Sequence, residues 1–105
     1  METENDVVYV GIGNNDDKLT QIDWSLFVRE VRDLCEEAGH IAGVWFSEPA
    51  ASWQNACFCV KTIKPSRRAW LRYQLIRLTE KYKQDSISYV EGETILLNPR
   101  KKDDR

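Results

Sequence analysis

The chain has 105 residues, of which 42% are hydrophobic and 10% are aromatic, and its formal net charge is -2. This length fits one domain, and the near balance of charges excludes a strong overall field that would attract nucleic acid or an anionic membrane. The start METEND is acidic, and the apolar run after it is far shorter than the roughly 20 residues of a membrane-spanning helix. We therefore expect a cytoplasmic protein with no membrane segment.

The first half of the chain predicts a strand, a helix and a second strand. Val7–Ile12 is apolar and rich in β-branched residues, which is typical of a buried strand. A helix is expected over Leu19–Gly39, because Thr20 and Asp23 have the spacing of a capping box and Gly39 suits a helix C-terminus. His40–Ser47 then predicts the second strand.

The second half of the chain predicts a strand, a helix and a last strand. Gln54–Ile63 reads as the third strand, and Pro65 fits the first turn of a helix that ends near Lys83. Ser86–Val90 predicts the fourth strand. Two alternatives remain for Thr94–Leu97, which either pairs back as an extra strand or continues the fourth strand past a bulge.

This order of elements predicts an α+β fold, the two-layer βαββαβ sandwich of the ferredoxin-like kind. The short link between strands two and three implies a hairpin, and right-handed crossovers favour an antiparallel sheet in the order 4-1-3-2 with two helices on one face. An extra C-terminal strand would extend this sheet. Residues 7–98 form the single domain, residues 1–6 a flexible tail and residues 99–105 a charged tail. Such a fold hosts many unrelated activities.

The predicted topology brings three connections to one end of the domain, which we call the polar end. Its residues are short, turn-compatible and rich in hydrogen-bonding groups. They can hold a polar ligand, or they can serve only the local backbone of the turns. The candidate binding residues are Asn14, Asn15, Asp16, Asp17, Lys18, Gln54, Asn55, Gln84, Asp85 and Ser86.

The face of the sheet without helices is the second candidate surface. Strand alternation places Tyr9 and Trp45 there, and we expect Tyr89 to join them. An apolar, aromatic face on so small a protein should be buried against a partner, and a homodimer is the simplest one. Thr94–Leu97 could instead cover this face, and base stacking is a rival that lacks the aromatic consensus of RNA-binding sheets in Gln54–Ile63.

No motif predicts a catalytic residue, a metal ligand or a cofactor. Gly11-Ile12-Gly13 lacks the third glycine of a dinucleotide fingerprint. Cys57 and Cys59 lack the spacing and the partners of a zinc site, so we expect free thiols. Asp16, Asp17 and Asp85 could gather round Mg²⁺ together with Glu48, and this is the basis of an alternative function.

These features favour a small non-enzymatic binding or regulatory module, such as an accessory or inhibitor protein of a mobile genetic element. It would bind a protein or a small polar ligand through the polar end, the open sheet face or both. One alternative is a metal-dependent hydrolase of a nucleotide or phosphodiester that uses the loop carboxylates. A second is an RNA-binding module that uses the sheet and the arginines of the second helix, although nucleic acid is not the expected partner.

Overall fold

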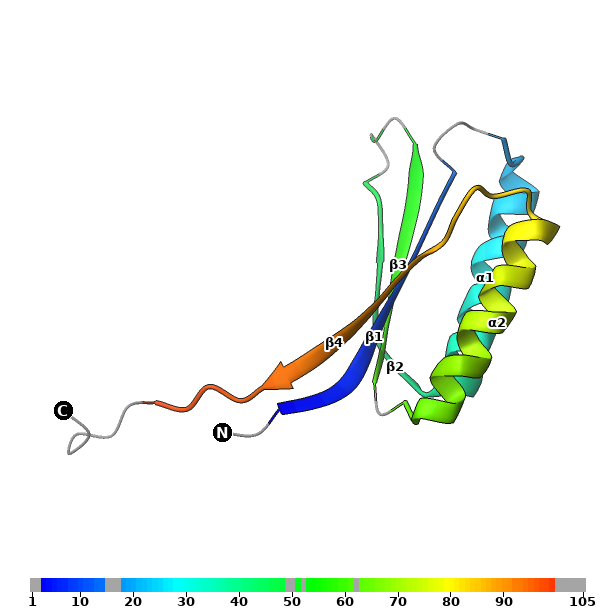
Figure 1. Ribbon diagram of the computed structural model, residues 1–105. Helices are drawn as coiled ribbons and strands as arrows, with labels where there is room; N and C mark the ends of the chain where they lie inside the picture. The colour runs from blue at the N-terminus through cyan, green and yellow to red at the C-terminus, as the bar shows by residue number, and fades with distance from the viewer. Residues whose placement is uncertain (1–2, 15–17, 49–50, 52, 62, 100–105) are drawn as a thin grey trace.

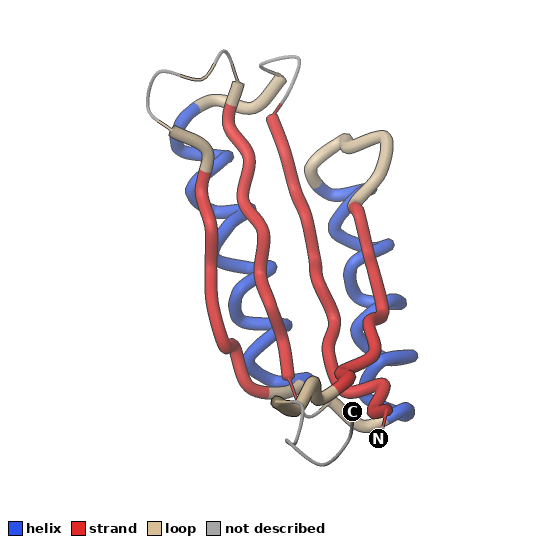
Figure 2. The backbone as a smooth tube through the Cα atoms, turned by 90° about the vertical axis from the view of Figure 1, so that its left-hand side faces the viewer, coloured by secondary structure: helices blue, strands red, loops and turns tan. Residues whose placement is uncertain are grey.

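The computed structural model describes residues 3–14, 18–48, 51, 53–61 and 63–99, and for residues 3–6 and 94 it describes the backbone alone. Its elements are β1 (Thr3–Asn14), α1 (Gln21–Ala38), β2 (His40–Phe46), β3 (Gln54–Lys61), α2 (Pro65–Lys81) and β4 (Ser88–Ile95). The strands form one antiparallel sheet in the order β2-β3-β1-β4, and both helices cover one of its faces (Figures 1 and 2). The predicted ferredoxin-like βαββαβ fold is thus confirmed.

Helix α1 begins and ends where the capping residues predict. Thr20 Oγ1 accepts a hydrogen bond from the Asp23 amide at 3.1 Å, which satisfies one of the free N–H groups of the first turn. At the other end, a Cβ atom on Gly39 would lie 2.7 Å from the Lys61 carbonyl oxygen. Only glycine therefore lets the end of α1 pack this closely on β3.

The core lies between the two helices and the inner face of the sheet. Phe27 of α1 is buried and stacks on Tyr82 at 4.7 Å between ring centroids. The predicted apolar stripes of both helices are buried in this layer. They consist of Trp24, Phe27, Val31, Cys35 and Ala38 in α1 and Leu71, Leu75 and Leu78 in α2.

Strands β1 and β4 are longer than predicted at the ends where they leave the body of the sheet. β1 begins at Thr3 and not at Val7, and β4 continues through Gly92 to Ile95 as one strand. There is therefore no turn at Glu91–Glu93. Residues Thr3 and Glu4 pair with β4 beyond the end of β3. This two-stranded extension, which we call the arm, curves away from the body of the domain (Figure 1).

Candidate functional site

The structure brings the described residues of the polar end together. Asn14 Nδ2 lies 3.2 Å from Gln54 Oε1, and Gly13 is the partner of Asn55 in the sheet. Lys18 and Asp85 approach to 4.0 Å between Nζ and Oδ1. Of the other predicted residues, Gln84 donates from Nε2 to the carbonyl oxygen of Tyr82, and Ser86 is exposed. Asn15, Asp16 and Asp17 lie outside the described residues.

The Asn14 side chain holds the backbone of the loop at the polar end. It is 2% exposed, and its Oδ1 accepts a hydrogen bond from the Leu19 amide at 3.0 Å while its Nδ2 donates to the Leu19 carbonyl at 3.1 Å. Gln54 exchanges hydrogen bonds with Gln21. These amides therefore bind the backbone and one another, which is the turn chemistry that such residues commonly serve.

No three side chains of His, Cys, Asp or Glu gather as possible metal ligands among the residues that the structure describes. Asp16 and Asp17, on which the alternative of a metal-dependent hydrolase depends, are outside that part of the chain. Asp85 is described, and its side chain is almost fully exposed and faces Lys18. The metal-dependent alternative stays a prediction.

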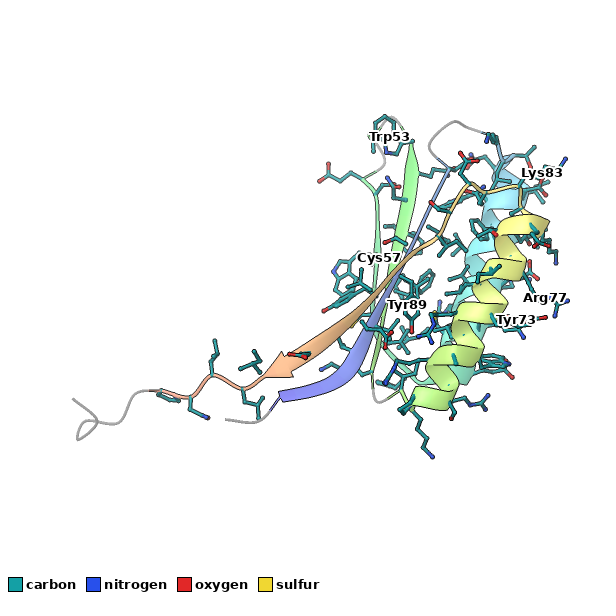
Figure 3. The ribbon with its side chains drawn as sticks, in the orientation of Figure 1. Trp53, Cys57, Tyr73, Arg77, Lys83 and Tyr89 are labelled. Atoms are coloured by element: carbon teal, nitrogen blue, oxygen red, sulfur yellow. The ribbon has the colours of Figure 1, made fainter. Side chains whose placement is uncertain are left out.

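The pairing register decides which side chains point to the open face, the face of the sheet opposite the helices. Gly11 of β1 pairs with Cys57 and with Ser88, and Cys57 pairs with Trp45. These four residues form one row across the open face, and the adjacent row contains Tyr9 and Val90 together with Gly43 and Cys59. Figure 3 shows Cys57 on the side away from the helices.

Tyr89 corrects the prediction for the open face. It pairs with Val10, a core residue, so it faces the helices and packs against the core (Figure 3). The guanidinium of Arg72 lies 5.6 Å from the centroid of the Tyr89 ring. The neighbouring residue Val90 occupies the open face in its place. The predicted position of Tyr89 on the open face is therefore wrong, and the predicted interface stays a prediction.

A depression in the open face, which we call the trough, is the best-formed candidate site there. Its lining includes Gly11 and Gly13, which have no side chains of their own, and its volume is about 510 Å³. The Ser88 side chain lies beside Gly11. Trp45, which is 56% exposed, borders the trough. Asn55, Cys57 and Ser88 line it as well, and none of the residues that line it carries a charged side chain.

The titratable groups of the open face keep it neutral. Burial raises the pKa of the Cys57 thiol, and the nearby Cys59 thiol raises it further. The pKa of Tyr9 is also raised, first by Cys59 and then by burial. Both shifts favour the protonated, uncharged form at neutral pH. The trough therefore suits an uncharged group better than an anion or a cation.

The cations of α2 contact groups within the chain. Arg68 Nε lies 2.8 Å and Arg72 Nη1 3.1 Å from the carboxylate of Glu91. Lys81 Nζ lies 2.8 Å from Glu30 Oε1. These contacts weigh against an α2 surface built to bind the phosphates of a nucleic acid, because phosphate binding would compete with each ion pair.

Two features of the site were not foreseen from the sequence. One is the pair of glycines in the lining of the trough, which the spacing of Gly11 and Gly13 on one strand face could have indicated. The other is the extension of β1 to Thr3, which pairs with the end of β4. That β4 continues past Glu91-Gly92-Glu93 is one of the two alternatives that the sequence left open. The structure shows the end of β4 as a strand through its pairing with residues 3–7 of β1.

The fold and the trough together define a class of protein, a two-layer ferredoxin-like sandwich with an uncharged depression on its open face. No protein-family model matches the chain, and no curated protein is significantly similar to it in sequence. In the described part of the chain, no helix combines the length and the apolar character needed to cross a bilayer.

Proposed function

We propose that the protein is a small non-enzymatic binding module that recognises a protein partner through the trough. The observation that carries this proposal is the contrast between the two candidate surfaces. At the polar end, the Gln54 side chain makes hydrogen bonds with those of Asn14 and Gln21, so these amide groups already have partners. On the open face, Trp45 is largely exposed beside an uncharged depression. Exposed apolar patches rimmed by polar groups generally mark interaction sites.

The shape of the trough favours a planar, uncharged group of the partner, and an aromatic side chain fits this description. Gly11 and Gly13 let a ring approach the sheet backbone closely. Trp45 offers a ring for offset or edge-to-face stacking. Asn55 and Ser88 supply hydrogen-bonding groups near it, as is usual for the few polar contacts that orient a ligand in an apolar site. An accessory, regulatory or inhibitor role is consistent with this mode of binding.

The proposal is tested with N-acetyl-tryptophanamide, an uncharged aromatic probe, whose affinity is measured by NMR titration. Trp45→Ala should weaken binding by about threefold to tenfold, because an aromatic pair contributes about 0.5–1.5 kcal/mol beyond area burial. Tyr73→Ala is the matched control, since Tyr73 is an exposed aromatic residue of α2, away from the trough (Figure 3). Equal affinities for the two variants would contradict the proposal.

A further inference from the structure

Strand β4 has a free edge. It is the last strand of the sheet on the side of β1, and β2 is the last strand on the other side. The edge of β2 is interrupted, because its register with β3 shifts between Ile41 and Gly43. Such irregularities discourage pairing with another chain. Between Glu4 and Val7 the extra residue lies in β1, so β4 itself stays regular at this point.

A groove runs beside this edge, between α2 and β4. Its volume is about 350 Å³. Leu75, Ile76, Ile87 and Tyr89 form the apolar part of its lining, and Arg72, Thr79, Asp85 and Ser86 form the polar part. The Tyr89 hydroxyl is buried and has no hydrogen-bond partner among the described residues. Protein cores are close-packed, so the groove is a part of the helix–sheet interface that side chains of this chain do not fill.

The arm carries an apolar segment that nothing in the described chain covers. Ile95, Leu96 and Leu97 are exposed, Leu97 by 87%. The arm is a two-stranded ribbon, and such ribbons are marginally stable without a third strand or a packing surface. A single partner could therefore cover its apolar side chains and pair with its free edge.

We propose that a second copy of this chain pairs with β4 in antiparallel fashion, with the two-fold axis at Gly92. This register places Ile95 of one copy opposite Tyr89 of the other. If the pairing extends past the ends of β4, which runs from Ser88 to Ile95, it also places Leu97 opposite Ile87. Residues opposite each other share one face of the sheet. Both apolar side chains of the arm therefore lie on the helix side, at the α2–β4 groove of the second copy. The two four-stranded sheets become one sheet of eight strands.

Charge complementarity supports the same register. Pairing about Gly92 puts Glu93 of one copy opposite Glu91 of the other. Glu91 contacts Arg68 and Arg72, and the Arg72 side chain is 46% exposed. The Arg72 guanidinium has donors for several hydrogen bonds, so it can bind a second carboxylate beside Glu91. The pairing therefore brings together two carboxylates and two guanidinium groups.

The neighbouring pairing registers match the apolar and charged residues of the two copies less well. With the two-fold axis at Glu91, Leu97 of one copy lies opposite Asp85 of the other, a charged residue that lines the groove. With the axis at Glu93, Ile95 lies opposite Glu91. A register that pairs residues of odd with residues of even number has no two-fold axis, because such an axis is perpendicular to the sheet and keeps each residue on the same face in both copies. Only the axis at Gly92 matches the apolar and charged groups together.

The test of the dimer is sedimentation equilibrium of the full chain and of three variants. Wild type should be dimeric at micromolar concentration, and Leu97→Glu should weaken the dimer by more than about a hundredfold, because it buries an unpaired charge. Glu93→Arg should weaken it as well. Glu37→Arg, an equal charge change on an exposed residue of α1, should leave it unchanged. A monomeric wild type, or a dimer that Leu97→Glu does not weaken, would overturn the proposal.

The pairing register of the two β4 strands is tested separately by NMR. In a mixed sample of labelled and unlabelled chains, an intermolecular nuclear Overhauser effect is expected between Val90 and Thr94. These residues are about 13 Å apart along one strand, so the signal cannot arise within a chain. A dimer that Trp45→Glu dissociates and Leu97→Glu does not would place the contact on the open face and contradict pairing at β4. The probe titration above is independent of this result.

Discussion

Asn14 and Trp45 belong to one sheet, and the burial of each is the reverse of what is usual for its residue type. Asn14 is buried and makes hydrogen bonds to both backbone groups of Leu19. Trp45 is mostly exposed, although tryptophan is highly buried on average in proteins. The first arrangement closes a loop and contributes to stability. In the second, the Trp45 ring lies against Gly43 while more than half of the residue stays exposed, and a partner would cover the exposed part.

Asn14→Ala should lower the free energy of unfolding by about 1–3 kcal/mol, because it leaves the buried groups of Leu19 without partners. Asn98→Ala, at an exposed position, is the control and should change stability by less than about 0.5 kcal/mol. Urea unfolding measures both values. Similar stabilities for the two variants would mean that Asn14 does not hold the loop and is available for a ligand.

Tyr82, at the C-terminal end of α2, and Glu30, in the middle of α1, link the two helices in a way that depends on pH. The Tyr82 hydroxyl donates a hydrogen bond to Glu30 Oε2. Burial is the larger cause, and this hydrogen bond the second, of a rise in the pKa of Tyr82 from 10.0 to about 12. A folded-state pKa above the unfolded value adds stability below the unfolded pKa, and that stability is lost as the pH rises through the folded value.

The free energy of unfolding should therefore decrease as the pH rises from 10 to about 12. Tyr82→Phe should reduce the slope in this range, because the variant has no phenol to ionise at this position. Tyr73→Phe removes an exposed phenol from α2 and serves as the control. Chemical denaturation at a series of alkaline pH values gives the slopes. Equal slopes for wild type and Tyr82→Phe would contradict the effect.

The helices and central strands were predictable because each carries a periodic apolar pattern with residues that mark its ends. Thr20, Gly39 and Pro65 fixed the helix limits to within a few residues. β4 was not predictable to the same degree. Alternation shows which residues of a strand share a face, but the pairing register decides which face meets the helices. For Tyr89 that register is set by Val10, a partner distant in sequence.

Helix α1 allows a direct test of its predicted buried face, because Phe27 is fully buried and the adjacent Leu26 is 41% exposed. Phe27→Ala should cost roughly 3–5 kcal/mol of unfolding free energy, the usual range for a buried aromatic residue. Leu26→Ala should cost less than about 1 kcal/mol. Thermal or urea unfolding distinguishes the two. A cost below about 1 kcal/mol for Phe27→Ala would show that the helix is packed through another face.

The whole molecule is extended for its length. Its Cα radius of gyration is 16.8 Å, against roughly 13 Å for a compact domain of this size. In Figure 1 the arm, and the described residues 96–99 after it, extend away from the body of the domain. The open face and the free edge of β4 are adjacent parts of one sheet, as Figure 2 shows. A dimer joined at β4 would therefore present two troughs on the same side of one continuous sheet.

The binding surface that we propose is the trough of the open face, which includes Asn55 and Ser86 of the polar end but not its hydrogen-bonded amides Asn14 and Gln54. Backbone amide shifts of the wild-type protein, followed by NMR during titration with N-acetyl-tryptophanamide, test this central claim most directly. We predict that the largest changes occur at Gly11, Gly13 and Cys57, which line the trough. Changes centred on Gln21 and Asp85 at the polar end, with none at Gly11 or Cys57, would contradict the claim.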